Sequence, residues 1–416
     1  MKKLRRSHWC MIATAVVLVA AIIIHLSCCS NRIYATDLME GITANPVQAS
    51  SDLSSRNPVV TDFAVRLLQA GNAEGENTLL SPLSVLYALA MTANGAEGET
   101  RTQMEQVLGM PVEEFNLYLY SYMQSQNGSL KLANSIWFNA DQRFTANREF
   151  LQINADYFGA SLYKASFDNR TLKDINTWVE QNTDGMIPEI LDEIPEEAVM
   201  YLINALVFEA KWQEVYTKHL IKDGSFTKED GTEQNVEFMR SVESWYLEDD
   251  YATGVWKYYE GRDYAFVALL PKEGITVSEY IATLNGDGLQ QLLAGRTRAT
   301  VETSLPKFET EFSADLAQVL AGMGMPDAFD EKEADFSRLG SSTAGDIFIS
   351  RVLHKTFITV GEQGTKAGAS TVVEMGDSGA MIVDFKRVHL DRPFVYMLVD
   401  AENNIPFFIG TMMDVG

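Results

Sequence analysis

Cysteine is almost missing from this chain of 416 residues: there are three, and all of them lie within the first 29 positions. The rest of the chain therefore has no cysteine pair for a disulfide and no cysteine and histidine cluster with the spacing of a zinc site. No glycine-rich loop joins an expected strand to an expected helix, as nucleotide sites require. The sequence thus predicts neither a metal site nor a cofactor, and a hydrophobic core has to stabilise the fold.

Positive charge is also scarce. The chain has 33 Lys and Arg against 57 Asp and Glu, which makes a formal net charge of −24. No stretch of basic residues is dense enough to neutralise phosphates or sulfates, and this argues against nucleic acid and against heparin as partners. We interpret the acidic stretch at 331–335 as a solvated surface.

Linkers rich in Pro, Gly or Ser are missing after residue 58, and so are internal repeats. Length alone favours two or three domains. Without a linker to separate them, we expect one large domain over residues 58–416. Residues 30–57 are polar and weakly patterned, which predicts a flexible tether.

The first 29 residues have the composition of an export signal. Basic residues precede an apolar run at 9–24, which ends at Leu26-Ser-Cys-Cys29. That ending resembles the lipobox of bacterial lipoproteins, in which Cys28 or Cys29 would carry the lipid. We therefore expect a protein exported from a bacterial cell, either extracellular or an outer-membrane lipoprotein that faces the periplasm or the surface. A membrane anchor is the alternative, although about sixteen apolar residues are short for a bilayer.

The body of the chain mixes helical and strand periods, which predicts an α+β fold. Helices are expected at 61–68, 82–94 and 100–109, and strands at 132–139, 201–208, 264–271 and 352–360. Ser81 can cap the second helix and Pro82 suits its first turn, while Thr100 and Gln103 have the spacing of a capping box for the third. The stretch at 201–208 is nearly all apolar, as in a strand covered on both faces.

Residues 362–379 follow a strong strand, yet their first ten positions hold no large apolar side chain that would pack against a core. Their pattern nevertheless has the period of a strand. One face carries small or β-branched residues, namely Thr365, Ala367, Ala369, Thr371 and Val373, and the other carries Lys366, Gly368, Ser370 and Val372. Such a segment can be a solvated loop in one state and a buried strand in another.

An ordinary flexible linker is the simplest interpretation of that composition, but its flanks favour another. Glu362-Gln-Gly-Thr-Lys-Ala-Gly-Ala-Ser-Thr371 precedes Asp391-Arg-Pro-Phe394 and the closing Phe407-Phe-Ile-Gly410. This arrangement resembles the hinge and reactive loop of the serpin family, and the resemblance extends over residues 58–412. It implies the α+β serpin fold, a single large domain with a mixed central sheet, further sheets, about eight or nine helices and an exposed reactive loop at about 362–390.

Other motifs match the same family. Taken alone, His354 would be a satisfied core histidine, but in serpins such a His meets an Asn and two helix-start serines in a polar cluster called the shutter. The resemblance assigns Ser81, Ser84, Asn204 and His354 to the shutter. It assigns Trp212, Lys307 and Glu362 to the breach, where the central sheet first opens and Lys307 pairs with Glu362. It assigns Glu362, Gly364, Thr365, Ala367, Ala369, Ser370 and Thr371 to the hinge.

The resemblance implies an inhibitor of serine proteases and not an enzyme; inhibitors of this type can also act on cysteine proteases. A protease cleaves the loop, and the hinge inserts into the central sheet while the protease is still attached as a covalent acyl-enzyme. By the family's spacing, the cleaved bond is Ser378-Gly379, with Met375 and Met381 as alternatives. A small residue there suits elastase-like or subtilisin-like proteases. The inhibitor itself is expected to be a monomer.

Two other functions fit parts of the sequence. A non-inhibitory serpin would act as a carrier or chaperone, but such relatives place bulky or charged residues where this hinge keeps small ones. The residues Gly376-Asp-Ser-Gly379 copy the sequence around the nucleophile of chymotrypsin-like proteases, which makes Ser378 a candidate nucleophile. The body offers only His219, His354 and His389 as bases, and none has the sequence setting of those proteases.

Overall fold

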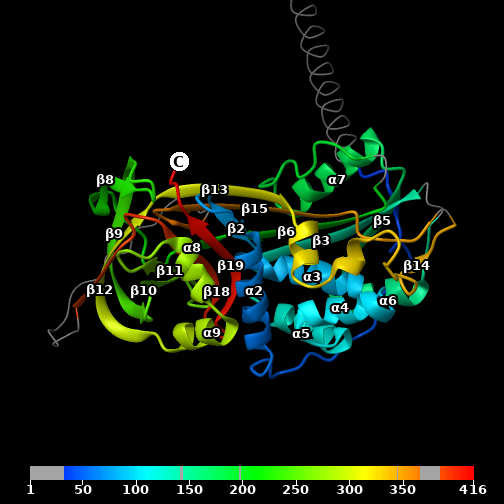
Figure 1. The fold of residues 1–416 in the computed structure, drawn as a ribbon, viewed down its shortest axis with the longest axis horizontal. Helices are drawn as coiled ribbons and strands as arrows, with labels where there is room; N and C mark the ends of the chain where they lie inside the picture. Colours follow the sequence, from blue (N-terminus) through cyan, green and yellow to red (C-terminus); the bar gives the residue numbers. More distant parts are fainter. Residues whose placement is uncertain (1–31, 141–143, 196–197, 344, 366–384) are drawn as a thin grey trace, which may run out of the picture.

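The computed structural model describes residues 32–140, 144–195, 198–343, 345–365 and 385–416. Within these ranges the chain forms nine α-helices and three β-sheets in one α+β domain, as the sequence predicts (Figure 1). The export signal, with Cys28 and Cys29, lies outside the described residues. None of the helices in the described ranges is long and apolar enough to cross a membrane.

A central sheet of eight strands organises the domain. Its strands follow the order β1-β5-β3-β6-β15-β16-β7, and β13 pairs with the other side of β15. The strands are β1 (Thr36–Asp37), β5 (Ser161–Ala165), β3 (Leu130–Asn139), β6 (Met200–Phe208), β15 (Arg351–Gly361), β16 (Gly364–Thr365), β7 (Ala210–Lys211) and β13 (Phe308–Asp315). Because β6 is antiparallel to β3 and parallel to β15, the sheet is mixed, as expected.

Helices cover both faces of this sheet, which explains why all nine residues of β6 are buried. Helix α3 (Pro82–Ala93) lies against one face and is itself buried throughout. The side chain of Ser81 caps α3 and Pro82 occupies its first turn, as predicted. Helix α7 (Asn169–Asn182) covers the opposite face, where Trp178 belongs to the same buried cluster as Trp137 and Tyr201 (Figure 1).

A nine-stranded sheet forms the other half of the molecule, on the left of Figure 1. Its order is β17-β12-β9-β10-β11-β18-β19-β2, and β8 pairs with β9 outside this order. The strands are β17 (Phe385–His389), β12 (Thr297–Pro306), β9 (Glu233–Glu248), β10 (Ala252–Tyr258), β11 (Tyr264–Pro271), β18 (Phe394–Asp400), β19 (Ile405–Met412), β2 (Thr78–Leu80) and β8 (Ile221–Thr227). Helix α2 (Asn57–Gly71) contacts β19 and α9 (Gly286–Ala294), so it joins this sheet to the helices.

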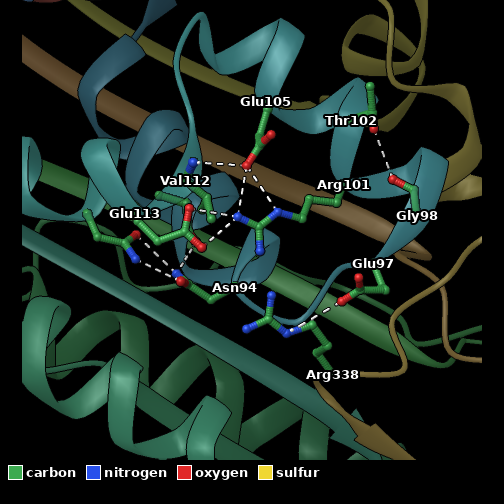
Figure 2. A network of polar contacts seen from close by, with 11 residues as sticks. Asn94, Glu97, Gly98, Arg101, Thr102, Glu105, Val112, Glu113 and Arg338 are labelled. Atoms are coloured by element: carbon green, nitrogen blue, oxygen red, sulfur yellow. Dashed lines mark hydrogen bonds and ion pairs between the residues drawn. The ribbon is translucent and has the colours of Figure 1, made fainter.

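Arg101 holds the corner between α4 (Gly98–Leu108) and α5 (Val112–Ser125), as Figure 2 shows. It donates hydrogen bonds to Glu105 at 3.0 Å and to both carboxylate oxygens of Glu113 at 2.6 and 2.7 Å. Glu105 also accepts a hydrogen bond from the Val112 amide at the start of α5. Partial burial acts to raise the pKa of Glu113, but the hydrogen bond and the positive charge of Arg101, together with a backbone hydrogen bond and the charge of Arg338, outweigh it, and the pKa lies below its ordinary value.

The capping box predicted for Thr100 and Gln103 is wrong. Helix α4 begins earlier, at Gly98, with Glu97 at its N-cap. The Thr100 hydroxyl instead accepts a hydrogen bond from the Asp335 amide at 2.9 Å, and the Gln103 side chain accepts one from the Asp327 amide at 3.1 Å. Both side chains therefore hold segments that are distant in the sequence.

The flexible tether expected at 30–57 is wrong for residues 32–57, which lie on the domain. Strand β1 extends the central sheet by pairing with β5. The Ala35 amide donates to the Asp174 carboxylate at 2.7 Å, and the Asn45 amide donates to Asp156 at 2.7 Å. A polar segment can be ordered in this way because its backbone amides find acceptors on the body, which composition alone does not reveal.

Candidate functional site

The central sheet opens between β6 and β15. These two strands pair in parallel only from Arg351 opposite Tyr201 to Lys355 opposite Ala205. Beyond that point β15 continues to Gly361, turns, and returns as β16, which pairs with β15 on one side and with β7 on the other. The hinge residues Gly364 and Thr365 therefore lie between β15 and β7, within the opening.

Gly364 fits this position because it has no side chain. Its φ is +148°, in the region that favours glycine. A Cβ atom placed there would lie 2.1 Å from the carbonyl oxygen of Ala210 and 2.7 Å from the Cα of Lys211. The close approach of β16 to β7 thus requires glycine.

Thr365 is the first hinge residue whose side chain enters the sheet. It is 2% exposed, and its hydroxyl lies 2.5 Å from the hydroxyl of Tyr259. The Tyr259 ring stacks on Trp212, with centroids 4.5 Å apart. Burial raises the pKa of Tyr259 strongly, so the phenol stays neutral and can donate or accept this hydrogen bond.

The turn before the hinge, residues 361–363, is held by the breach residues. Trp212 donates from its indole nitrogen to the Gly361 carbonyl at 2.8 Å and from its amide to the Gln363 carbonyl at 2.9 Å. Lys307 lies 2.5 Å from the Glu362 carboxylate and 2.9 Å from Glu237. Partial burial acts to lower the pKa of Lys307, but its hydrogen bonds with the two carboxylates outweigh this and raise it.

A buried lysine that the sequence analysis missed lies directly behind this turn. Lys257 is 4% exposed, and its Nζ atom is 2.8 Å from Glu243 Oε1 and 3.2 Å from the Glu214 carbonyl oxygen. The ammonium lies 4.5 Å from the ring centroid of Tyr216 and 5.4 Å from that of Trp212, within range of cation–π attraction. Burial acts to lower the pKa of Lys257, but Tyr216 and Glu243 raise it above its ordinary value, so the lysine is charged.

This buried ion pair supports the turn through Tyr216, whose amide donates to the Glu362 carbonyl at 2.9 Å. The signal in the sequence was a single Lys between Trp256 and Tyr258 in an otherwise largely apolar strand. Such a residue is more often a solvated edge position. Its carboxylate partner is on a different strand and is found only in the fold.

The four predicted shutter residues meet where β6 and β15 are still paired, next to the opening. The Ser81 amide donates to His354 Nε2 at 3.1 Å, and His354 Nδ1 lies 2.5 Å from Asn204 Oδ1. The Ser84 hydroxyl donates to the same Asn204 oxygen at 3.1 Å. Because Nε2 accepts, the ring is neutral and its proton is on Nδ1. Burial lowers the pKa of His354 from 6.5 to about 3, which keeps it neutral.

The remaining candidates are not brought together with these groups in the described ranges. Ala367, Ala369, Ser370 and Thr371 of the hinge lie outside the described residues, and so do Ser378, Gly379, Met375 and Met381 at the cleavage site. The two other candidate bases of the body are engaged elsewhere: His219 contacts Thr217 at 2.9 Å, and His389 lies 3.9 Å from Glu302. Among the described residues, no cluster of three or more His, Cys, Asp or Glu side chains could hold a metal ion.

Comparisons with known proteins agree with this geometry. The family model "Serpin (serine protease inhibitor)" matches residues 58–415. The chain is 31% identical to Serpin B10 of Bos taurus over 397 residues, which cover 86% of this chain and 97% of that protein. Among solved structures, the thermophilic serpin tengpin in its native state is 45% identical, with a TM-score of 0.87 over 91% of this chain and 99% of tengpin. Tengpin in its latent state has a TM-score of 0.78 at 42% identity, over 89% of this chain and 100% of that one.

Proposed function

The chain belongs to the serpin family, and from this premise we propose that it inhibits serine endopeptidases by trapping the acyl-enzyme as its cleaved loop enters the central sheet. The trapping step needs three parts: an open sheet, a strand that can fill the opening, and a hinge from which insertion starts. The opening between β6 and β15 and the docked start of the hinge supply the first and third parts.

The register of the hinge is the observation that carries the proposal. Thr365 lies opposite Val360, and continuing this antiparallel register along β15 brings Ala367 opposite Ile358. The residues of β15 on this side of the strand are all buried, namely Val352, His354, Thr356, Ile358 and Val360. In this register, the small side chains of the loop therefore lie on the same side of the sheet as the buried side chains of β15.

The other face of the loop, which carries Lys366, lies on the side of the sheet where the side chains of β15 are half-buried. In the same register, Lys366 comes opposite Thr359, which is half-buried. Its charge can therefore stay in water, whereas a charge on the small face would be buried without a partner. The sequence of the loop is thus compatible with full insertion in one register only, because a shift by one residue exchanges the two faces.

Insertion would carry the peptidase far from where it first bound. About fourteen residues at roughly 3.3 Å each make a strand of about 45 Å. The backbone hydrogen bonds and the buried small side chains of this new strand are absent while the loop is outside, so their formation drives the movement. The higher similarity to the native than to the latent state of tengpin supports an intact chain that is ready to insert.

We further propose cleavage at Ser378-Gly379, with Met375 and Met381 as alternatives, by elastase-like or subtilisin-like peptidases whose primary pockets accept small side chains. The chain should be incubated with pancreatic elastase and with subtilisin. We expect a covalent band that resists SDS and a released peptide whose new N-terminus lies within residues 376–382. Clean cleavage without a covalent band would instead support a carrier or chaperone, and labelling of Ser378 by a fluorophosphonate would support a protease.

A pair of loop variants tests the register. Ala369→Glu places a charge on the small face, so we expect it to convert the inhibitor into a substrate that is cleaved without trapping. Ser370→Glu places the same charge on the opposite face, in register with Lys355 of β15, and should leave trapping nearly unchanged. Equal behaviour of the two variants would contradict the insertion register.

We also propose that the chain is exported and carries lipid on Cys28 or Cys29. Replacing both cysteines by alanine should release the protein from the membrane fraction of an expressing bacterium. Retention in that fraction would argue for an uncleaved anchor at residues 9–24.

A further inference from the structure

Asparagine is followed directly by glycine at three places in the chain, namely Asn94-Gly95, Asn127-Gly128 and Asn285-Gly286. In such a pair the backbone nitrogen of the glycine can attack the side-chain amide carbon of the asparagine, because glycine has no side chain to hinder the approach. The new carbon–nitrogen bond closes a succinimide ring, and the side-chain nitrogen leaves as ammonia with the proton of the glycine amide. Water then opens the ring to aspartate or to isoaspartate. The structure distinguishes the three pairs by how firmly each is held.

The first pair is buried and held at both residues. Asn94, labelled in Figure 2, is 4% exposed. Its side-chain nitrogen donates to the Ala90 carbonyl at 2.7 Å, and its side-chain oxygen accepts from Asn116 at 2.7 Å. The Gly95 amide donates to the Thr92 carbonyl at 2.8 Å, so the nitrogen that would attack is already engaged. We expect this pair to be inert in the folded chain.

The third pair starts helix α9 and is held by it. Asn285 is the N-cap, with an extended backbone at φ −146° and ψ 163°, and its side-chain oxygen accepts from the Gly288 amide at 2.9 Å. Gly286 is buried against helix α2, since a Cβ atom placed on it would lie 2.5 Å from the Cα of Asp62. Ring closure at Asn285 would require a rotation of the backbone that breaks the cap and moves the start of α9 away from α2.

The second pair lies in the loop between α5 and β3, where both Asn127 and Gly128 are exposed. Gly128 has a φ of +86°, and a Cβ atom placed on it would meet no atom within 4 Å, so the backbone has room to rotate. Within the part of the chain that the structure describes, the Gly128 amide donates no hydrogen bond. The Ser129 amide donates to Asn127 Oδ1 at 3.1 Å, which stabilises the negative oxygen that forms when the glycine nitrogen attacks.

The side chain of Asn127 fastens this loop to the turn between β10 and β11, because its Nδ2 atom donates to Asp263 Oδ2 at 2.6 Å. Deamidation replaces the donor by a carboxylate, so an attractive contact becomes a repulsion between two negative charges. A cavity of about 240 Å³ beside the pair is lined by two further carboxylates, Asp400 and Glu402, and by one cation, Arg262. The new charge therefore enters surroundings that are already acidic.

We propose that Asn127 is a site of spontaneous deamidation in the folded chain, and that its conversion to aspartate or isoaspartate detaches the loop between α5 and β3 from the turn between β10 and β11. This contact joins the two large sheets, because β3 belongs to the central sheet and β10 and β11 belong to the second sheet (Figure 1). A chain that has aged in this way loses one link between them. The modification does not depend on protease inhibition.

The three pairs are controls for one another within a single molecule. The folded chain is incubated in mildly alkaline buffer, which favours loss of the proton from the glycine amide, and mass spectrometry then measures aspartate and isoaspartate at each pair. A parallel sample is unfolded in urea. We expect conversion at Asn127 to be at least about tenfold faster than at Asn94 and Asn285 in the folded chain, and similar at all three in urea. Conversion at Asn127 no faster than at the other two in the folded chain would overturn the proposal.

A second set of variants tests what the modification does. Asn127→Asp reproduces one product and should lower the unfolding temperature by about 2 °C. Asn127→Asp combined with Asp263→Asn exchanges donor and acceptor and should restore the wild-type value. Asn285→Asp is the matched control, because aspartate caps a helix as well as asparagine does. If Asn127→Asp unfolds at the wild-type temperature, or if the exchange restores nothing, the loop is not released by repulsion from Asp263 and that part of the proposal is wrong.

Discussion

The hydroxyl of Thr365 lies 2.5 Å from the hydroxyl of Tyr259, so the first small-faced residue of the hinge is already anchored within the central sheet. Insertion of a strand is costly to begin, because the first residues lose conformational freedom before many hydrogen bonds have formed. When the start of the hinge is already docked in the intact chain, part of this conformational freedom has been lost before insertion begins. In the proposed mechanism, the residues around Thr365 should therefore control how fast the rest of the loop inserts after cleavage.

Removing the hydroxyl of Tyr259 tests this anchor. Tyr259→Phe keeps the ring stacked on Trp212 but leaves the Thr365 hydroxyl buried without its partner, at a cost of about 1 to 3 kcal/mol. We expect more cleaved, untrapped inhibitor and a higher stoichiometry of inhibition. Tyr258→Phe, at the adjacent half-buried tyrosine, is the control and should change neither quantity. An unchanged stoichiometry for Tyr259→Phe would show that the anchor does not limit insertion.

A methyl group on Gly364 should prevent the hinge from docking. The added Cβ of Gly364→Ala would lie 2.1 Å from the Ala210 carbonyl oxygen, and the backbone is in a region that alanine rarely adopts. We expect β16 to leave the sheet, which hydrogen exchange at the Thr365 amide would report, and the stoichiometry of inhibition to rise severalfold. Gly361→Ala is the matched control because a Cβ at Gly361 meets no atom within 4 Å. Equal exchange rates in the two variants would contradict the steric argument.

Breaking the buried ion pair between Lys257 and Glu243 should lower the free energy of unfolding more than breaking an ion pair on the surface would. Lys257→Met leaves Glu243, whose side chain is 14% exposed, without its cation, and breaking a buried pair in this way costs about 3 to 5 kcal/mol. Changing both residues, Lys257→Met with Glu243→Leu, removes the unpaired charge and should recover most of the loss. Denaturant unfolding of the intact chain measures both effects. A double variant as unstable as the single one would show that the ion pair is not the source of the loss.

The shutter histidine predicts a loss of stability in mild acid. His354 is neutral in the folded chain because burial lowers its pKa from 6.5 to about 3. Below pH 6.5 the unfolded chain binds a proton that the folded chain does not, so stability present above pH 6.5 falls as the pH decreases toward 3, at about 1.4 kcal/mol per pH unit. Between pH 6.5 and 5, the loss should be smaller in His354→Gln than in the wild type. Identical pH profiles for the wild type and His354→Gln would exclude His354 as the cause.

Much of the fold could be read from local patterns. The apolar run at 201–208 is the buried strand β6, and the serine followed by proline at 81–82 starts helix α3, because these features depend on residues close together in the chain. The family motifs were sufficient to bring Ser81, Ser84, Asn204 and His354 into one candidate cluster, and the structure brings the four into contact. The capping box at Thr100 failed for the opposite reason: partners far along the chain compete for its side chain and for that of Gln103.

By itself, the sequence determined that residues 201–208 form a buried strand, that a helix starts at Ser81 and Pro82, and which face of residues 365–373 is small enough to be buried, because alternation, capping and side-chain size are local properties. Only the tertiary structure decided that β6 and β15 separate beyond Ala205 and Lys355, that Gly364 and Thr365 dock in the space between β15 and β7, and that Lys257 finds Glu243. Each of these depends on where distant backbones meet, and that position follows from packing of the whole core rather than from any short stretch of residues.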